Sequence, residues 1–306
     1  MLGNMQEGQL LISGLIEHAE TYHKDTEIVS RSVEGPIHRY TLKDAADRSR
    51  KLANALGKLD LQQGDVVGTL AWNTFRHFEL YFGVSGIGCV VNTVNPRLFP
   101  EQLIYIINHA KNKYLFVDLT FVELVESISD SLESVKGIII LTDKDHMPET
   151  KLKNVICYEE LIADESNEYD WPVFDENTAS SLCYTSGTTG NPKGVLYSHR
   201  STLLHTWIVS SGNVGKVSSS SVILPVVPMF HVNAWGIPYA SAMFGAKLIL
   251  PGPLMDGASI YELIDLEKPD LLMGVPTVWL GLLQYLNETN QTLDSVSTAL
   301  VGGSAA

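Results

Sequence analysis

The chain has 306 residues, 45% of them hydrophobic, which is enough to bury a sizeable core and to form more than one compact unit. It carries 21 basic and 35 acidic residues, and its formal net charge is therefore -14. This balance argues against a nucleic-acid-binding protein, which usually presents a basic face, and it gives no support to docking on an anionic membrane.

The cysteines and the apolar segments bear on the compartment. Cys89, Cys157 and Cys183 lie far apart and form no CxxC pair, so we expect reduced thiols rather than a disulfide framework or a zinc site. The first fourteen residues lack the basic start and the apolar run of a secretory signal. The longest apolar stretch, near residues 81–91, is too short and too rich in glycine to cross a bilayer. We therefore expect a cytoplasmic protein without a transmembrane segment.

Helix and strand patterns alternate along the first half of the chain. Thr41 and Asp44 have the arrangement of a helix N-cap, and apolar or small side chains then recur on one face as far as Leu56. Further helices are predicted at 74–86, 100–107 and 121–132, and strands at 65–71, 89–94, 114–117 and 137–141. Short apolar strands separated by helices indicate a mostly parallel sheet that is covered on both faces.

A polar, acidic stretch at 142–177 interrupts this alternation and predicts a boundary. We expect a first α/β subdomain, with the N-terminal segment, at 1–175 and a second at 176–306. Strands are then predicted at 179–184, 222–227, 247–250, 270–274 and 298–301, and helices at 199–211, 259–266 and 276–286. The last strand runs directly into two glycines, where doubly wound sheets tend to place ligands. We therefore expect the second subdomain to be incomplete at its C-terminus.

The segment that follows the strand at 179–184 carries the clearest chemical signal. Residues 185–194 supply four hydroxyls, three glycines and Lys193. Hydroxyls and backbone N–H groups are the donors that polyphosphate oxygens need, and glycines allow the backbone to come close. The segment fits neither a Walker A loop nor the dinucleotide fingerprint. Its composition alone is also typical of a hydrophilic surface loop, but its order favours phosphate binding.

The string at 185–194, T-S-G-T-T-G-N-P-K-G, closely resembles the hallmark motif of the adenylate-forming superfamily. This superfamily includes acyl-CoA synthetases, non-ribosomal peptide adenylation domains and firefly-type luciferases, and its motif is a loop that holds the β- and γ-phosphates of ATP. The resemblance implies an α/β fold, namely the large N-terminal domain of the adenylate-forming fold with two doubly wound subdomains, here truncated. It also implies that Thr185 lies near the magnesium ion. It assigns the phosphate contacts to Thr185, Ser186, Gly187, Thr188, Thr189, Gly190 and Lys193.

A second cluster, P-M-F-H-V-N-A-W at 228–235, matches the family's Pro-x-Phe-His segment. By itself, a histidine beside aromatic residues is usually a core or loop residue. Beside the phosphate loop, the resemblance implies that His231 borders the reacting carboxylate as a catalytic residue and that Val232 lies in the substrate pocket. Trp235 corresponds to an aromatic guard on the acyl tunnel of long-chain fatty acyl-CoA synthetases.

The end of the chain resembles the family's glycine-rich strand end, whose backbone faces the acyl and adenylate groups. Gly302 is then expected in the substrate pocket, and Gly303 and Ser304 beside the nucleotide. The segments 224–235, 250–253 and 274–279 are similar to the bacterial medium- and long-chain fatty acyl-CoA synthetases.

The resemblance implies a ligase that uses ATP and Mg²⁺ to activate a fatty acid. The carboxylate attacks the α-phosphorus of ATP to give an acyl adenylate and pyrophosphate, and the thiol of coenzyme A then displaces AMP. The family uses further elements: an aromatic-Gly-x-Thr-Glu segment, a ribose-binding aspartate, a hinge and a C-terminal lysine. None of these is found within the 306 residues, so we expect little or no ligase activity and only weak ATP binding from this chain alone.

Two alternatives remain open. The substrate could be an aryl or other carboxylic acid, or an amino acid; an amino-acid enzyme would need an acidic partner for the substrate ammonium near 228–231, and Asp256 lies well past that segment. The chain could instead be a non-catalytic truncated paralogue that acts as a binding module. Fatty acid members of the family are sometimes dimers, so a homodimer is a further expectation.

Overall fold

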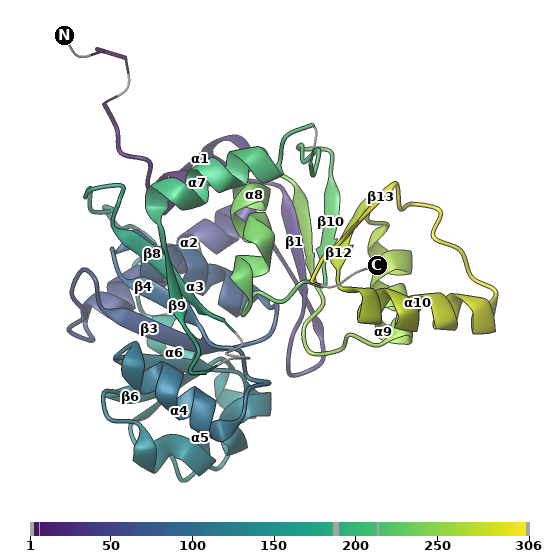
Figure 1. Cartoon of the computed structure of the whole chain (residues 1–306). Helices are drawn as coiled ribbons and strands as arrows, with labels where there is room; N and C mark the ends of the chain where they lie inside the picture. Colours follow the sequence, from purple (N-terminus) through teal and green to yellow (C-terminus); the bar gives the residue numbers. More distant parts are fainter. Residues whose placement is uncertain (1–2, 6, 186–189, 213, 304–306) are drawn as a thin grey trace.

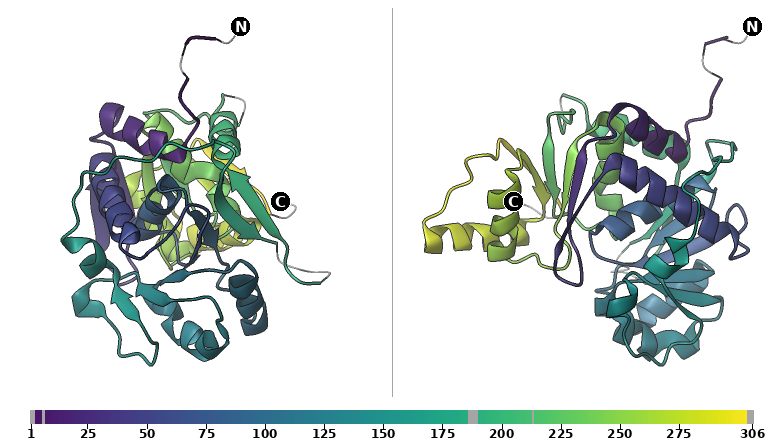
Figure 2. Two further views of the ribbon diagram at one scale, coloured as in Figure 1. Left: turned by 90° about the vertical axis from the view of Figure 1, so that its left-hand side faces the viewer. Right: turned by 180° about the vertical axis from the view of Figure 1, so that it is seen from behind.

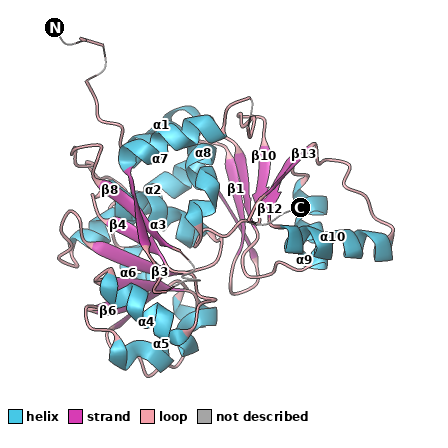
Figure 3. Cartoon of the chain, viewed as in Figure 1, coloured by secondary structure: helices cyan, strands magenta, loops and turns pink. Residues whose placement is uncertain are grey.

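Two β-sheets organise the part of the chain that the computed structural model describes, which comprises residues 3–5, 7–185, 190–212 and 214–303 (Figures 1 and 3). The six-stranded sheet has the order β13 (Thr298–Val301), β12 (Leu271–Gly274), β10 (Val222–Pro225), β11 (Lys247–Leu250), β1 (Glu27–Arg31) and β2 (Ile37–Thr41). The seven-stranded sheet has the order β7 (Val155–Cys157), β6 (Gly137–Ile140), β5 (Tyr114–Val117), β3 (Val66–Leu70), β4 (Val90–Thr93), β8 (Ala179–Tyr184) and β9 (Gly194–Ser198). Neighbouring strands run parallel except in the β1–β2 and β8–β9 pairs.

Helices cover both faces of each sheet, as the alternating pattern predicts. They are α1 (Ile12–Tyr22), α2 (Leu42–Gly57), α3 (Phe75–Gly86), α4 (Pro100–His109), α5 (Val122–Ile128), α6 (Tyr158–Ala163), α7 (His199–Val209), α8 (Ile237–Phe244), α9 (Gly257–Glu267) and α10 (Pro276–Thr289). On the six-stranded sheet, α9 and α10 pack on the face that points away from the other sheet (Figure 2). On the seven-stranded sheet, α4 and α5 cover one face, and α2, α3 and α6 cover the other.

Helix α3 lies between the two sheets and explains why they form one body. Every residue of α3 is buried. Its aromatic side chains Phe78 and Phe82 belong to the core shared with α1, α8 and the six-stranded sheet, whereas Leu80 and Val84 belong to the core of the seven-stranded sheet. A helix that is apolar on both sides is stable only where both sides are covered.

The sheets do not divide at residue 175, where the sequence predicts a boundary. Strands β1 and β2 precede that residue but pair into the sheet of β10–β13, and β8 and β9 follow it but pair into the sheet of β3–β7. The polar stretch at 142–177 is also not a linker, because it contains β7 and α6 at the edge of the seven-stranded sheet. Strand pairing between residues far apart in sequence decides the subdomains here.

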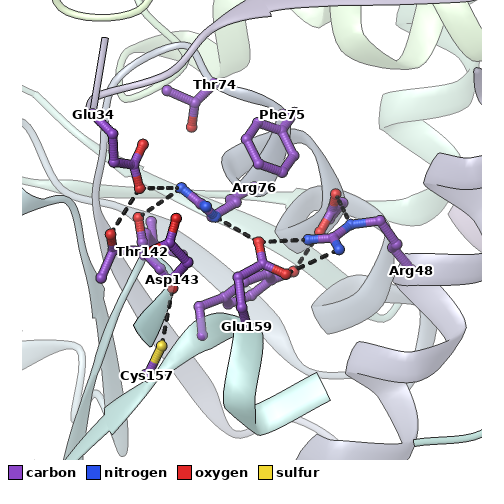
Figure 4. A network of polar contacts seen from close by, with 12 residues as sticks. Glu34, Arg48, Thr74, Phe75, Arg76, Thr142, Asp143, Cys157 and Glu159 are labelled. Atoms are coloured by element: carbon purple, nitrogen blue, oxygen red, sulfur yellow. Dashed lines mark hydrogen bonds and ion pairs between the residues drawn. The ribbon is translucent and has the colours of Figure 1, made fainter. Parts of the chain in front are cut away.

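Buried ion pairs fasten the β1–β2 hairpin to the seven-stranded sheet (Figure 4). Arg76 on α3 contacts Glu34 of the hairpin at 2.8 Å and Glu159 of α6 at 2.8 Å. Arg48 on α2 binds both oxygens of Glu159 and also contacts Glu79 at 2.7 Å. Because Glu79 and Arg76 are buried, each charge depends on its partner, and removing one partner would leave an uncompensated buried charge.

One asparagine directly after β3 holds the loop that leads to the 228–235 segment. The Asn73 side-chain amide donates to the carbonyls of Pro225 and Val227, both at 2.9 Å, and its oxygen accepts the N–H of Met229 at 2.7 Å. The Asn73 carbonyl accepts the N–H of Gly252 at 3.0 Å. Asn73 is fully buried, so these four bonds satisfy groups that water cannot reach.

We predict that Asn73→Ala lowers the free energy of unfolding by roughly 3 kcal/mol or more, because three buried backbone groups would lose their partner at about 1–3 kcal/mol each. Urea denaturation followed by circular dichroism would measure this. The matched control is Asn92→Ala: Asn92 is also fully buried, but it donates one side-chain bond, to Asn112, and its oxygen has no partner among the described residues. Equal losses in the two variants would contradict the special role of Asn73.

Candidate active site

The predicted phosphate loop is the connection of a β-hairpin. Strands β8 and β9 pair antiparallel up to Tyr184 and Gly194. The loop is closed at its base by two hydrogen bonds: the Thr185 N–H donates to the Lys193 carbonyl at 3.0 Å, and the Lys193 N–H donates to Thr185 Oγ1 at 3.1 Å. The hairpin therefore holds the first hydroxyl of the motif against the backbone of Lys193, the residue that carries the cation.

Several predicted phosphate contacts cannot be placed. Ser186, Gly187, Thr188 and Thr189 lie outside the described residues, as does Ser304. Gly190 is described and has φ of 142°, a conformation that favours glycine. Apart from its chain neighbours, no atom of the described residues lies within 4 Å of the position that a Cβ would take there.

The 228–235 segment ends in a left-handed turn that the sequence does not reveal. Val232, Asn233, Ala234 and Trp235 have φ values of 47°, 48°, 48° and 55°, and Gly236 follows with 76°. For residues other than glycine this conformation costs roughly 1–2 kcal/mol each. Such strain persists only where the surrounding structure enforces it, and it is concentrated at functional sites.

Asn233 anchors this turn to the strand that leads into the phosphate loop. Its amide nitrogen donates to Ser181 Oγ at 2.7 Å, and its oxygen accepts the Cys183 thiol at 3.3 Å. Asn233 is buried, and asparagine tolerates the left-handed conformation better than most residues. Since Ser181 and Cys183 belong to β8, which Thr185 follows, the turn and the base of the phosphate loop form one connected unit.

The turn also meets the glycine-rich end of β13. A Cβ at Gly302 would lie 2.7 Å from Trp235 Cζ2, so only glycine fits against this ring. Gly303 has φ of 88°, and a Cβ there would lie 3.2 Å from Val275 at the start of α10. The structure thus brings together Trp235 and Gly302, two of the residues predicted to line the substrate pocket.

His231 and Val232 begin this turn and are both exposed. Partial burial lowers the pKa of His231 below its usual value, which favours a neutral imidazole at neutral pH. The preceding residue, Phe230, is buried beside Trp72, with ring centroids 6.0 Å apart. His231 is therefore held at the surface between a buried aromatic residue and the strained turn.

Trp72 and Asp118 mark the switch point of the seven-stranded sheet, because β4 follows β3 on one side and β5 returns to the other. The carboxyl ends of strands at such a point commonly border ligands. The backbone N–H of Trp72 donates to Asp118 Oδ2 at 2.7 Å, and burial raises the pKa of Asp118 to about 7. The exposed Arg97 guanidinium lies 5.7 Å from the Trp72 ring centroid and 5.6 Å from that of Phe230. Sequence analysis did not single out these residues.

The charges of the chain are segregated around this site. Residues 177–255, from β8 to the loop after β11, contain no aspartate or glutamate. The same segment contains Lys193, Arg200, Lys216 and Lys247 and has a net charge of +4, although the whole chain carries -14. In the fold, two of these cations are paired with carboxylates from outside the segment, Arg200 with Glu176 and Lys247 with Glu27 and Glu267. The segment is therefore less positive in space than its sequence indicates.

Two negative findings concern the described residues. Among them, no three histidine, cysteine, aspartate or glutamate side chains are grouped so as to hold a metal ion. None of the described helices is long and apolar enough to cross a membrane.

We predict that glycine and alanine have opposite effects at two positions. At Asn233 both variants lose the amide anchor, but glycine accepts φ of 48° without strain, so Asn233→Gly should be more stable than Asn233→Ala by about 1 kcal/mol. The control is Ala240 in the right-handed helix α8, where glycine should be less stable than alanine by about 1 kcal/mol. Urea denaturation of the four proteins would measure both differences. The same sign at both positions would contradict the left-handed turn.

We predict a pH-dependent gain for Asp118→Asn. The pKa of Asp118 in the fold, about 7, lies above the ordinary 3.8, so the folded state retains a proton that the unfolded state loses, and wild-type stability falls as the pH rises from about 4 to 7. Asparagine does not ionise, and its side-chain oxygen can still accept the hydrogen bond from the backbone N–H of Trp72. The advantage of the variant should grow over that range and stay constant above it, as thermal unfolding at pH 4 to 8 would show. A difference that does not change with pH would refute the assignment.

Comparison with known proteins agrees with the family that the sequence motifs indicate. Residues 15–306 match the family described as AMP-binding enzyme. The chain is 50% identical over 305 residues to a 3-methylmercaptopropionyl-CoA ligase of Ruegeria lacuscaerulensis, which covers all of this chain and 57% of that protein. It is 49% identical to a medium-chain-fatty-acid–CoA ligase of Ectopseudomonas oleovorans, covering all of this chain and 56% of that protein. The chain therefore spans little more than half the length of these relatives.

Solved structures agree on the fold. The crystal structure of the anthranilate CoA ligase AuaEII in complex with anthranoyl-AMP superposes with a TM-score of 0.82 at 21% identity, over 95% of this chain and 54% of that one. A long-chain-fatty-acid-CoA ligase of Archaeoglobus fulgidus gives 0.82 at 18% identity, over 97% of this chain and 58% of that one. This is the mixed α/β architecture of the N-terminal domain of the adenylate-forming fold, and with the match over residues 15–306 it shows that the chain belongs to the AMP-binding enzyme family.

Proposed function

We propose that this chain is the ATP- and acid-binding part of an AMP-forming acid:CoA ligase whose substrate is a fatty acid or a similar apolar carboxylic acid. The observation that carries the proposal is the strained turn at 232–236, which is anchored through Asn233 to the strand before the phosphate loop and contacts Gly302 through Trp235. The turn therefore lies between the predicted phosphate site and the predicted acyl site. The names of the relatives, medium-chain-fatty-acid–CoA ligase among them, support the same reaction class.

The hairpin loop would bind the β- and γ-phosphates of ATP. Its hydroxyls and N–H groups donate hydrogen bonds to phosphate oxygens, and Lys193 neutralises charge. Lys193 is bonded to Thr185 through its backbone N–H, so its ammonium can be directed toward the phosphates without opening the base of the loop. No aspartate or glutamate lies within 177–255, so the hairpin itself carries no carboxylate that would repel the triphosphate.

A magnesium ion would be held mainly by ATP. Thr185 Oγ1 is an oxygen ligand of the type that Mg²⁺ accepts, and after accepting one N–H from Lys193 it retains a further lone pair. No carboxylate lies within 177–255, so the remaining ligands would be phosphate oxygens, water and the glutamate of the aromatic-Gly-x-Thr-Glu segment that the family resemblance implies. The ion would neutralise charge on the phosphates while the carboxylate approaches.

His231, Val232, Trp235 and Gly302 would bind the acid. A neutral His231 can donate a hydrogen bond to a carboxylate oxygen without taking up its proton. Trp235 and Gly302 form an apolar contact beside it. The carboxylate would thus face the nucleotide while its tail lies on the apolar side, and positioning of this kind accounts for much of the rate of such reactions. Coenzyme A would then accept the acyl group as the second substrate.

The substrate remains open within the acids. An amino acid would need a carboxylate for its ammonium group, and the absence of aspartate and glutamate from 177–255 makes this alternative poorer. A short thioether acid is favoured by the name of the Ruegeria relative, 3-methylmercaptopropionyl-CoA ligase. Cytoplasmic location and a homodimer remain predictions.

We predict that the 306-residue chain alone binds ATP weakly and shows little or no ligase activity. Fused after Ala306 to the C-terminal remainder of the Ruegeria ligase, it should release AMP only when acid, ATP and coenzyme A are all present. Lys193→Ala should lower kcat/KM of the fusion by about 10²-fold, because a charge that stabilises the transition state is lost. AMP release would be measured for the fusion, and ATP binding to the chain alone by calorimetry.

The matched control is Lys216→Ala, which removes a cation from the same acid-free segment outside the hairpin loop. Both activity and ATP binding should be nearly unchanged. Equal losses in the two variants would indicate a general charge effect and refute a specific role of Lys193. Ligase activity of the unfused chain would refute the prediction that further elements are required.

A further inference from the structure

The hairpin that carries the predicted phosphate loop leaves the sheet at Tyr184. Strand β8 pairs with β4 only as far as Cys183, which lies opposite Thr93. From Tyr184 on, its only strand partner among the described residues is β9, the edge strand of the seven-stranded sheet. The β9 residues nearest the loop are exposed, with Val195 at 42% and Leu196 at 62%. A ribbon of two strands is only marginally stable by itself, so the direction of the hairpin depends on contacts beyond its own strand pairing.

A histidine at the end of α4 meets the hairpin at this point. The Tyr184 hydroxyl lies 2.7 Å from Nδ1 of His109, and the two rings meet edge to face with their centroids 5.9 Å apart. His109 in turn stacks on Tyr105, one helical turn earlier, with centroids 5.2 Å apart. Burial raises the pKa of Tyr184 to about 12, so the phenol keeps its proton at neutral pH and is the donor to a neutral imidazole. Within the described part of 184–196, no other side chain is hydrogen-bonded to an element outside the hairpin.

The Tyr184 ring also packs across the hairpin. Tyr184 and Gly194 are opposite each other in the β8–β9 register. A Cβ on Gly194 would lie 3.2 Å from Tyr184 Cζ and 3.4 Å from its hydroxyl oxygen, so the ring lies against the partner strand. The next residue, Thr185, closes the base of the loop with Lys193. His109 is therefore connected through a single side chain to both strands of the hairpin, immediately before the base of the loop.

We propose that His109 is a positioning residue of the phosphate hairpin: through Tyr184 it fixes the direction in which the hairpin leaves the sheet, and with it the place of the base of the loop. The inference rests on the proposed function, because the direction of the hairpin bears on the reaction only if the loop binds the nucleotide. His109 lies on α4, outside both sequence motifs, and acts through Tyr184 rather than on a substrate. A hairpin that is already held in place loses less freedom when the phosphates bind, so the contact should strengthen ATP binding.

The first measurement needs no nucleotide. Exchange of the Thr185 and Lys193 amide protons with solvent would be followed by NMR in the 306-residue chain, because both amides are hydrogen-bonded at the base of the loop. His109→Ala and Tyr184→Phe should each speed this exchange about fivefold, as expected for the loss of one neutral hydrogen bond. His109→Asn should restore slow exchange, because its side-chain oxygen can accept the hydrogen bond of the Tyr184 hydroxyl in place of Nδ1.

The second measurement is ATP binding to the same proteins by calorimetry. His109→Ala and Tyr184→Phe should each weaken binding about fivefold. The double variant should bind no more weakly than either single one, because both changes break the same bond. His109→Asn should bind ATP nearly as well as the wild type. Additive losses in the double variant, or equal losses in His109→Asn and His109→Ala, would indicate separate packing effects and refute positioning through Tyr184.

The matched control is His146→Ala. His146 is also an exposed histidine whose Nδ1 makes a 2.7 Å bond, but its partner is Asp143 after β6, which β5, β3 and β4 separate from β8. This variant should keep the wild-type exchange rates and ATP affinity. Unchanged exchange in His109→Ala and Tyr184→Phe, with both folded by circular dichroism, would overturn the inference whether or not ATP binds. A wild-type chain that does not bind ATP would instead count against the proposed function, and the exchange rates would still decide whether His109 holds the hairpin.

Discussion

The geometry of the site depends on Asn73, which joins two sheets that share no strand. Asn73 lies three residues after β3 ends in the seven-stranded sheet. Its side chain bonds to the carbonyl of Pro225 at the end of β10, and to the Val227 carbonyl and the Met229 N–H in the loop that follows. A side chain with two donors and a planar acceptor can do this at one position, whereas a longer or charged side chain could not fit the same buried space. His231 lies two residues beyond Met229, so its place relative to the seven-stranded sheet follows from this contact.

The left-handed turn is the second constraint, and it depends on the first. Once Met229 is fixed by Asn73 and Gly302 by its N–H bond to Gly274, the chain between His231 and α8 has little freedom. Asn233 then holds the turn on Ser181 and Cys183 of β8. Four non-glycine residues remain in a disfavoured conformation because both ends and the middle are tied. In the proposed function, this strain places Trp235 and His231 before any substrate binds, so that less ordering is required at binding.

The structure agrees with the predictions that depend on neighbouring residues, whereas pairing between strands far apart in sequence was not predicted. The capping box at Thr41 and Asp44 and the strand at 114–117 are confirmed, because they depend on neighbours within a few residues. The β1–β2 hairpin and the antiparallel strand β9 were not predicted. Strand β1 pairs with β11, more than two hundred residues away, and β9 begins at Gly194, the last residue of the segment whose composition is typical of a loop. The same limitation explains the boundary placed at 175. For the candidate site, the motifs contain Trp235, Gly302 and also Asn233. The contacts of Asn233 and Asn73 are with residues at least fifty positions away, so no local pattern reveals them as anchors.

In the proposed function, an acidic chain has to bind a polyanion, and the distribution of its charges bears on this requirement. At physiological ionic strength charges are screened over about 8 Å, so a nucleotide in the hairpin loop would respond to its immediate surroundings rather than to the net charge of -14. All acidic residues of the chain lie before residue 177 or after residue 255. Many of them are used there in ion pairs, such as those of Glu34 and Glu159 with Arg76, which hold the two sheets together. Two cations of the acid-free segment also take part in this cohesion, since Arg200 is paired with Glu176 and Lys247 with Glu27 and Glu267. In the proposed function, the attraction of the triphosphate therefore comes from the hairpin loop and Lys193 rather than from the segment as a whole.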